Sequence, residues 1–274
     1  MQNTNNPFKY SDHLPTMKKF IVNNQILCIG TWNVLFEKWL RMNIGPNGDG
    51  HIAKYFNHLA TMDSNNRKNG ILSTICELLK FVDILALQEF DGVHLNELNN
   101  ELKKLGNFEI IMPNMINGFD TDQETALTAK GSNDLQLVIY NATKLKHNVI
   151  SSHLEYYHNK DTTKKINKRI MNISFLVNNI EFRFINTHVQ FMAIDQLTTY
   201  IDNIKKGSPQ KYNLPIIVVG DMNQDDRPNN LFGSPNDPNL LAYTNMNVFE
   251  QLSYTHIDTK GKFVTYDHVW YKEI

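Results

Sequence analysis

The sequence has few cysteines, little net charge and no long apolar run, and each shortage excludes a class of protein. Two cysteines, Cys28 and Cys76, stand in apolar segments of the 274 residues. We therefore expect buried free thiols in a reducing compartment rather than a disulfide framework. The formal net charge is −1 and the pI is near 6.8, whereas a protein that grips a long duplex usually carries more positive charge. The composition favours a short or small substrate.

Membrane and export signals are also lacking. No segment approaches the ~18 apolar residues of a membrane span. The first ten residues, MQNTNNPFKY, have no apolar core, so we expect no signal peptide and a cytoplasmic or otherwise intracellular location. Hydrophobic residues nonetheless make up 41% of the chain, which is enough for a real core.

Strand and helix patterns are interspersed along the chain. Short apolar runs predict strands at 26–34, 83–90, 135–140, 172–177, 181–189, 214–223 and 262–271. Apolar residues at three- and four-residue spacing predict helices at 71–82, 93–105 and 192–206. The polar stretches 41–69 and 113–134 are interpreted as surface loops. This mixture, with a hairpin over 172–188, predicts an α/β protein with mixed sheets.

Polar residues stand at the ends of several predicted strands. They are Asn33, Glu89, His188, Asp221, Asn223 and Asp267. Taken singly, Asn33 fits a helix cap, Glu89 and Asp221 fit turns, and His188 fits a satisfied core histidine. Sites in α/β sheets gather where strand ends converge, so the whole set predicts one site.

Five short motifs in this order resemble the endonuclease/exonuclease/phosphatase superfamily, which includes DNase I-like nucleases, deadenylases and inositol-polyphosphate 5-phosphatases. They are Trp32-Asn33, Leu87-Gln88-Glu89, Thr187-His188, Gly220-Asp221-Met222-Asn223 and Asp267-His268-Val269. The resemblance covers residues 26–271 and implies a DNase I-like, four-layered α/β sandwich of two mixed β-sheets flanked by helices. One departure is Asp134-Leu135, where the family usually has Asp-Gly, so that loop's substrate contacts are not carried over.

A sixth family motif, Ser-Asp-His followed by x-Pro and the last strand, does not follow Asp267. It stands near the start instead, as Ser11-Asp12-His13-Leu14-Pro15, before the apolar run 16–22 and an Asn23-Asn24 turn. We therefore predict a circularly permuted single domain, 1–274, in which residues 9–22 supply the family's usual C-terminal motif and strand.

Two alternatives to the permutation remain. The N-terminal match is accidental and belongs to a disordered tail, or His268 supplies the histidine. Successive strand side chains point to opposite faces, so His268 should face away if Asp267 faces the site.

The resemblance also implies roles for these residues. Glu89, Asn33 and Asp12 would offer the hard oxygen ligands that Mg²⁺ prefers, with Mn²⁺ possible. Asp221 would accept a proton from the attacking water or orient it, and Asn223 would hold Asp221 or the phosphate. His13, backed by Asp267, and His188 would contact the phosphate.

The segment 254–271, YTHIDTKGKFVTYDHVWY, looks like the deadenylase, nocturnin and 2′,5′-phosphodiesterase branch. It favours a Mg²⁺-dependent phosphodiesterase or nuclease acting on RNA or a short nucleotide. The alternatives are a phospholipid or inositol/sugar-phosphate phosphoesterase, a DNA endonuclease, and an inactive binding module.

Two further groups of residues stay open between a packing or solvent role and a substrate role. Tyr55, Phe56 and Phe119 either stack bases or pack. The basic run Lys164, Lys165, Lys168 and Arg169 is either a solvated loop or steers an anionic substrate.

Overall fold

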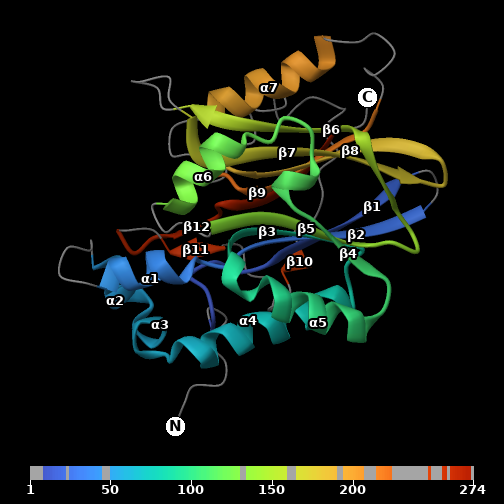
Figure 1. Ribbon diagram of the computed structural model, residues 1–274. Coiled ribbons are helices and arrows are strands. Elements are labelled where there is room, and N and C mark those ends of the chain that lie inside the picture. Colours follow the sequence, from blue (N-terminus) through green and yellow to red (C-terminus); the bar gives the residue numbers. More distant parts are fainter. Residues whose placement is uncertain are drawn as a thin grey trace.

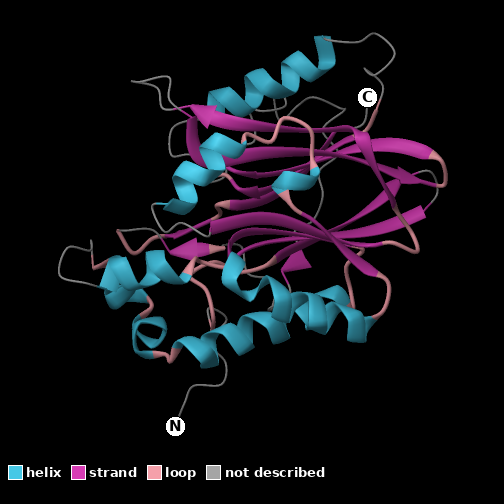
Figure 2. Cartoon of the chain, viewed as in Figure 1, coloured by secondary structure: helices cyan, strands magenta, loops and turns pink. Residues whose placement is uncertain are grey.

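Two β-sheets lie face to face, with helices on the outer face of each (Figures 1 and 2). The computed structural model describes residues 9–22, 25–44, 50–129, 134–158, 165–189, 194–206, 214–223, 246–247, 255–257 and 260–272. This is the α/β sandwich of two mixed sheets flanked by helices that the motifs predict.

The first sheet has six described strands and the second has five. The first sheet runs in the order β10 (Met246–Asn247), β1 (Thr16–Val22), β2 (Gln25–Asn33), β3 (Ile84–Asp91), β5 (Asp134–Asn141) and β4 (Phe108–Ile111). The second runs β13 (Asp267–Lys272), β9 (Ile216–Asp221), β8 (Ile180–His188), β7 (Lys165–Val177) and β6 (Lys146–His158). Both are mixed, because β2 pairs with β3 and β8 with β9 in parallel, whereas the other neighbours are antiparallel. The short strands β11 (His256–Ile257) and β12 (Phe263–Val264) pair separately.

Helices cover the outer faces and one end of the sandwich. Figure 1 shows α4 (Ser64–Leu79) and α5 (Leu95–Leu105) along the first sheet and α7 (Ile194–Lys206) along the second. The short helices α1 (Glu37–Ile44), α2 (His51–Tyr55) and α3 (Asn57–Thr61) lie at one end, and α6 (Thr121–Ala129) lies beside β6 and β7. None of the helices in these described ranges combines the length and the apolar composition needed to cross a bilayer.

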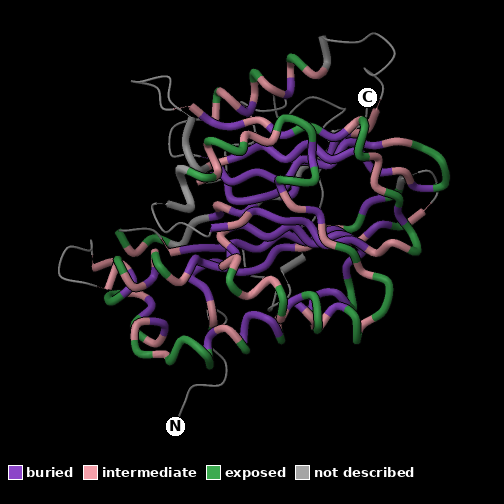
Figure 3. Tube along the Cα trace, viewed as in Figure 1, coloured by how far each residue is buried: buried purple, intermediate pink, exposed green. Residues whose placement is uncertain are grey.

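Alternation along the strands explains the layers. Ile84 and Ala86 of β3 belong to the buried cluster between the sheets, whereas Leu85 and Leu87 pack with α4. Successive residues of a strand face opposite sides, and both sides are covered here, so the strands read as continuous apolar runs. Figure 3 shows this buried band running through both sheets.

The hairpin over 172–188 and the strand at 16–22 were predicted correctly. Asn178 and Asn179 turn the β7–β8 hairpin with φ of 48° and 63°, a conformation that asparagine tolerates better than most residues. β1 covers 16–22 and pairs antiparallel with β2. The Asn23-Asn24 turn lies outside the described residues.

The structure differs from the expected elements in three main respects. The stretches 41–69 and 113–134 are not loops throughout, because they contain the end of α1, helices α2 and α3, the start of α4, and α6. Helix α4 begins at Ser64, ahead of the predicted 71–82, because Asp63 caps it by accepting hydrogen bonds from Asn65 N and Asn66 N. The 13-residue strand β6 was not predicted from the sequence. Its pairing with β7 shifts register twice, so its apolar residues do not alternate regularly.

Replacing Gly220 should destabilise the fold strongly. Gly220 has φ 134°, and an added Cβ would lie 1.8 Å from Thr187 O on the neighbouring strand. Gly106 has a similar φ of 124°, but a Cβ added there would meet no heavy atom within 4 Å, so Gly106→Ala is a matched control for backbone strain alone. In urea unfolding, Gly220→Ala should lose about 1–3 kcal/mol more stability than Gly106→Ala, the usual cost of overpacking. Equal losses would contradict the register of β8 and β9.

Candidate active site

The sheet topology brings five polar strand ends to one edge of the sandwich. Asn33 ends β2, which runs parallel to β3, the strand of Glu89. Asp221 ends β9, which runs parallel to β8, the strand that ends at His188. Asp267 begins β13 and pairs with Asp221 because that strand runs antiparallel to β9. β1 is antiparallel to β2, with Thr16 opposite Thr31, so the segment before β1 returns to the same edge and carries His13 there.

Glu89 reaches this edge through a break in the strand. The β3–β5 register shifts between Leu87 and Phe90, and Glu89 has a positive φ of 56°. A bulge re-aims a side chain, and a non-glycine residue at positive φ stores strain that functional sites often hold. The Glu89 carboxylate lies beside Asn33, and its Oε2 accepts a hydrogen bond from Phe36 N at 3.2 Å.

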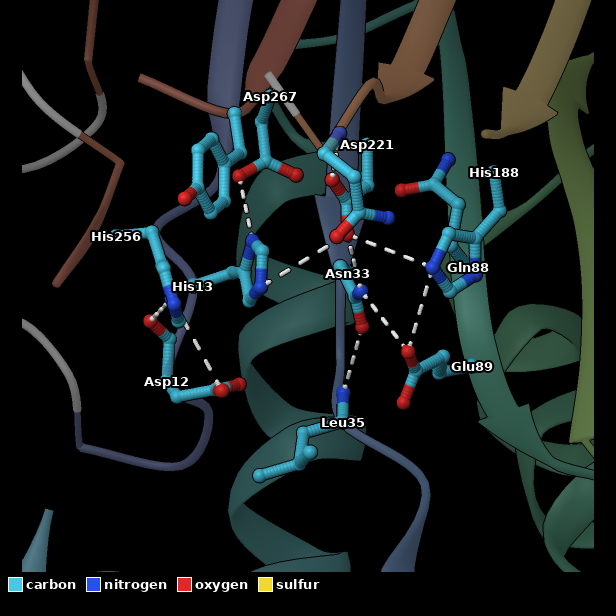
Figure 4. A network of polar contacts seen from close by, with 12 residues as sticks. Asp12, His13, Asn33, Leu35, Gln88, Glu89, His188, Asp221, His256 and Asp267 are labelled. Atoms are coloured by element: carbon cyan, nitrogen blue, oxygen red, sulfur yellow. Dashed lines mark hydrogen bonds and ion pairs between the residues drawn. The ribbon is translucent and has the colours of Figure 1, made fainter. Parts of the chain in front are cut away.

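His13 and Asp267 form a short, buried polar pair at the site. The distance from His13 Nδ1 to Asp267 Oδ2 is 2.7 Å, and both residues are buried. Burial alone would lower the pKa of His13, but Asp267, Asp12 and Asp221 outweigh it and raise that pKa well above its usual range. His13 is therefore an imidazolium that donates its Nδ1–H to Asp267 (Figure 4). Its Nε2–H faces Asp221 Oδ2 at 3.9 Å, which is too long for a hydrogen bond.

Asp221 is held on both carboxylate oxygens. Oδ1 accepts from Asn223 N at 2.8 Å and Oδ2 accepts from Asn33 Nδ2 at 2.9 Å. Burial opposes ionisation, but the charge of His13 and these hydrogen bonds more than offset it and lower the pKa of Asp221 below its usual range. The carboxylate is ionised and fixed in orientation. Asn223 holds it through its main chain, because the Asn223 side-chain amide donates to Val189 O instead.

Asn33 bridges two carboxylates. Its Nδ2 donates to Asp221 Oδ2 and lies 3.3 Å from Glu89 Oε1, while its Oδ1 accepts from Leu35 N at 3.0 Å. An amide oxygen has two lone pairs, so one remains for a metal. Asn33 thus orients Glu89 and Asp221 whether or not it also acts as a metal ligand.

His188 and Lys168 lie together on the opposite wall. His188 Nε2 lies 3.5 Å from both Glu89 Oε1 and Asp221 Oδ2, and Lys168 Nζ contacts both ring nitrogens of His188. An ammonium donates only to an unprotonated nitrogen. In agreement, burial and Lys168 lower the pKa of His188 to about 4. His188 is therefore neutral, in contrast to His13.

The basic run is not a solvated loop at its described end. Lys168 is about one-fifth exposed, and its Nζ lies 3.8 Å from Glu89 Oε1. Arg169 is buried and forms two hydrogen bonds with Glu124, at 2.8 and 2.7 Å. Lys164 lies outside the described residues.

The three predicted metal ligands are divided in space. Figure 4 shows Glu89 next to Asn33, whereas Asp12 lies on the side of His13 and His256. Asp12 Oδ1 lies 3.4 Å from Ser11 Oγ, and its Oδ2 lies 3.9 Å from His256 Nδ1. Asn33, Glu89 and Asp12 nonetheless line one cavity of about 580 Å³. Two other groups bring ligand atoms within 4.8 Å of one another, Asp12–His13–His256 and His13–Asp221–Asp267, but an imidazolium at His13 has no lone pair for a metal.

The oxygen donors beside Glu89 fit a divalent cation. Each Glu89 oxygen accepts a single hydrogen bond from a described residue, and a carboxylate has about four acceptor positions. Asn33 Oδ1 keeps a free lone pair beside it, and hard oxygen donors of this kind suit Mg²⁺, which retains several waters.

All the predicted site residues except Asp267 line this cavity, and so does Lys168 of the basic run. The sequence did not reveal the other lining residues, which are Trp39, Asn43, His51, His256 and Tyr266, together with Leu35 and Val189. Tyr55, Phe56 and Phe119, for which stacking and packing were both open, do not line the cavity. Phe56 is buried in the cluster under α1–α3 with Tyr55 packed against it, and Phe119 packs against the central core. The aromatic residues of the cavity stand singly in the sequence, so no periodic pattern marks them.

Two buried polar residues missed from the sequence support the site. Arg67 of α4 donates to Tyr10 O, Val34 O, Leu35 O and Glu37, which ties the Ser11–Asp12–His13 segment to the turn after Asn33. Gln88 donates to Asn186 Oδ1 at 2.8 Å and so joins the two sheets directly beneath Glu89.

The chain matches no known family model and no curated protein sequence. Among solved structures it is similar to ANGEL2, described as a 2′,3′-cyclic phosphatase, at 13% identity and a TM-score of 0.52, covering 96% of this chain and 84% of that one. It is similar to D. rerio TDP2 humanised by 14 mutations at 15% identity and a TM-score of 0.50, again covering 96% and 84%. The human nocturnin catalytic domain is 17% identical with a TM-score of 0.46, over 78% of this chain and 66% of that one, so this chain spans just under two thirds of that structure.

These likenesses identify the fold. The chain has the DNase I-like fold of the endonuclease/exonuclease/phosphatase superfamily. The identities are too low for any neighbour's activity to be transferred directly.

Arg67 should contribute far more stability than its neighbour Arg41, although both pair with Glu37. Arg67 is buried, whereas the Arg41 side chain is 38% exposed. Arg67→Met removes the donor to Glu37 Oε2 and to three backbone carbonyls, and breaking a buried pair from one side costs about 3–5 kcal/mol. Arg41→Met, the control, removes a partly exposed pair worth less than about 1 kcal/mol, together with hydrogen bonds to Ala60 O, Met62 O and Ser64 Oγ. Urea unfolding of the two variants measures the difference, and similar losses would contradict the anchoring role.

Proposed function

We propose that this protein is a metal-dependent phosphodiesterase that hydrolyses a phosphate ester in RNA or in a short nucleotide. The proposal is carried by one observation: Glu89, Asp221 and His13 converge in one cavity, with Asp267 bonded to His13 behind the cavity wall. Phosphoester hydrolysis requires three parts: an ionised acid that orients the attacking water, a cationic donor to the phosphate, and oxygen ligands for a metal cation.

His13 is the proposed phosphate donor. Its Nδ1–H is engaged by Asp267, so its Nε2–H is directed by that hydrogen bond toward the cavity. A charged donor stabilises most where negative charge grows in the transition state. Lys168 adds a second positive charge on the opposite wall, where it would attract the anionic substrate.

Asp221 is the proposed partner of the attacking water. Its oxygens are fixed by Asn33 and Asn223, so the water would be held in one orientation. A general base works best with a pKa near the working pH, and the pKa of Asp221 is lowered. This favours orientation of the water as its main contribution, with His188 kept neutral beside it.

Mg²⁺ is the proposed cofactor, with Mn²⁺ as a possible substitute. Glu89 and Asn33 would hold it, with Asp12 reaching it directly or through water. When bound, the ion would polarise a phosphoryl oxygen and neutralise charge on the leaving group.

The N-terminal segment supplies a catalytic residue in this proposal, which makes the chain a circular permutant of its fold. Three facts support it: β1 is the neighbour of β2, His13 contacts Asp267, and the Ser11 hydroxyl donates to Asn33 O at 2.8 Å. A single domain over residues 1–274, with 9–22 in place of the usual C-terminal motif, follows from the same proposal.

A substrate panel tests the proposed activity. A cavity of about 580 Å³ falls in the range of small-ligand sites, which supports a nucleotide or a strand end over a duplex. We expect Mg²⁺-dependent release from oligo(A), 2′,5′-linked oligonucleotide or a nucleoside cyclic phosphate, and none from double-stranded DNA. Turnover of sphingomyelin or an inositol polyphosphate instead would assign the phospholipid or sugar-phosphate alternative, and no turnover of any member would favour a binding module.

Activity should depend on Glu89 and on a divalent cation together. Glu89→Gln removes the charge that attracts the cation while it keeps the side-chain shape, so turnover should fall by about 10²-fold or more and no longer respond to added Mg²⁺. Glu101→Gln, on the exposed face of α5, is the control and should behave like the parent. Full turnover of the parent in excess chelator would refute metal dependence.

His13 should be essential although it lies near the start of the chain. His13→Ala should lower kcat by about 10²-fold or more, the usual loss for one transition-state donor, with the fold checked by circular dichroism. His153→Ala changes a half-exposed histidine of β6 away from the cavity and is the matched control. Normal activity in His13→Ala, with loss in His268→Ala, would instead indicate an unpermuted member of the fold.

A further inference from the structure

His256 lies directly against His13 and takes no part in the proposed hydrolysis itself. The two imidazole rings stack with centroids 4.4 Å apart and 26° between their planes. The backbones of the two residues also form an antiparallel bridge, although they stand near opposite ends of the sequence. His256 is buried, and its ring also stacks on Tyr266 at 5.1 Å.

A hydrogen bond fixes the rotation of the His256 ring within the plane of that ring. Its Nδ1 lies 2.9 Å from Asp12 O, and a carbonyl oxygen only accepts, so Nδ1 must be the protonated nitrogen. The residue before His13 is therefore tied to the ring that lies on His13. Rotation of His256 would break this hydrogen bond and both ring contacts together.

His13 needs such a support because one hydrogen bond does not fix a plane. The bond from Nδ1 to Asp267 holds one nitrogen but leaves the imidazole free to swing about the donor–acceptor direction. A ring stacked on the imidazole face removes that freedom. Misplacement of a reacting group by about 1 Å can cost about 10²-fold in rate, so the support has a kinetic value.

We propose that His256 is a positioning residue: its ring sets the plane of the His13 imidazole so that Nδ1 meets Asp267 and Nε2 faces the cavity. The catalytic consequence rests on the proposed function, whereas the positioning itself does not.

The neighbouring Thr255 places this support in register with Asp267. Thr255 Oγ1 accepts hydrogen bonds from Tyr266 N at 3.0 Å and Asp267 N at 3.1 Å, and Thr255 O accepts from Leu14 N at 2.9 Å. One dipeptide, Thr255–His256, thus contacts the backbone on both sides of the His13–Asp267 pair. The acid and the imidazole are positioned from the same short segment.

Two substitutions distinguish the effect of the stacked ring from the effect of the hydrogen bond to Asp12 O. His256→Phe keeps a flat ring on His13 but lacks the donor to Asp12 O. His256→Asn keeps a short donor but has no ring. His147→Asn, at a half-buried histidine of β6 that bonds Ser152, is the matched control outside the cavity.

The first readout is the low-field proton resonance of the His13 Nδ1–H···Asp267 hydrogen bond in the full chain, assigned by its loss in His13→Gln. We expect it to persist in His256→Phe and His147→Asn and to broaden or vanish in His256→Asn. The second readout is steady-state kinetics, in which His256→Asn should lower kcat about 10–100-fold with little change in KM, and His256→Phe should restore most of kcat. His256→Leu is a second ringless variant should His256→Asn not fold.

The outcomes are decisive in either direction. An unchanged His13 resonance in the ringless variants would overturn the proposal, and so would equal losses of kcat in His256→Phe and His256→Asn. If the parent shows no phosphoesterase activity, the proposed function fails, but the resonance still tests whether His256 positions His13.

Discussion

One buried hydrogen bond, from His13 Nδ1–H to Asp267 Oδ2, joins the site across nearly the whole length of the chain. The two residues are 254 positions apart in the sequence, but the distance between these two atoms is 2.7 Å. One precedes β1 of the first sheet, and the other begins β13 of the second. A charge-assisted bond in a buried site is strong, and loss of either partner would leave an uncompensated charge. The pair therefore constrains the packing of the sheets as well as the chemistry of the cavity.

The sheets supply the rest of the preorganisation. Gln88 and Asn186 join them by a buried hydrogen bond beneath Glu89, so the two strand edges that carry the acids cannot slide without breaking it. Glu89 and Asn223 both adopt positive φ, at 56° and 49°. Strained backbone of this kind persists where surrounding structure over-determines it. Rigid strands thus hold side chains in positions that local sequence alone would not favour.

The strand-end motifs allowed the fold and the polar strand-end residues of the cavity to be predicted, because a polar residue after an apolar strand is visible in the sequence. The support around them was not visible. Arg67 reads as an ordinary helix residue, and its burial depends on the tertiary approach of Tyr10. His256 likewise enters the cavity through a bridge to the distant His13. Strand β6 was missed because its bulges disrupt the alternation on which the prediction relied. Tertiary contacts decided each of these cases.

A double-mutant cycle in the free energy of unfolding tests the central pair most directly. Urea denaturation of the parent, His13→Gln, Asp267→Asn and the double variant yields their interaction energy without any assumption about substrate. Residues in one buried network interact by about 0.5–3 kcal/mol. For this charge-assisted pair we predict a value above about 1 kcal/mol, with the double variant much less destabilised than the sum of the single ones. Additive losses, agreeing within about 0.3–0.5 kcal/mol, would contradict the pairing of the chain's beginning with its last strand.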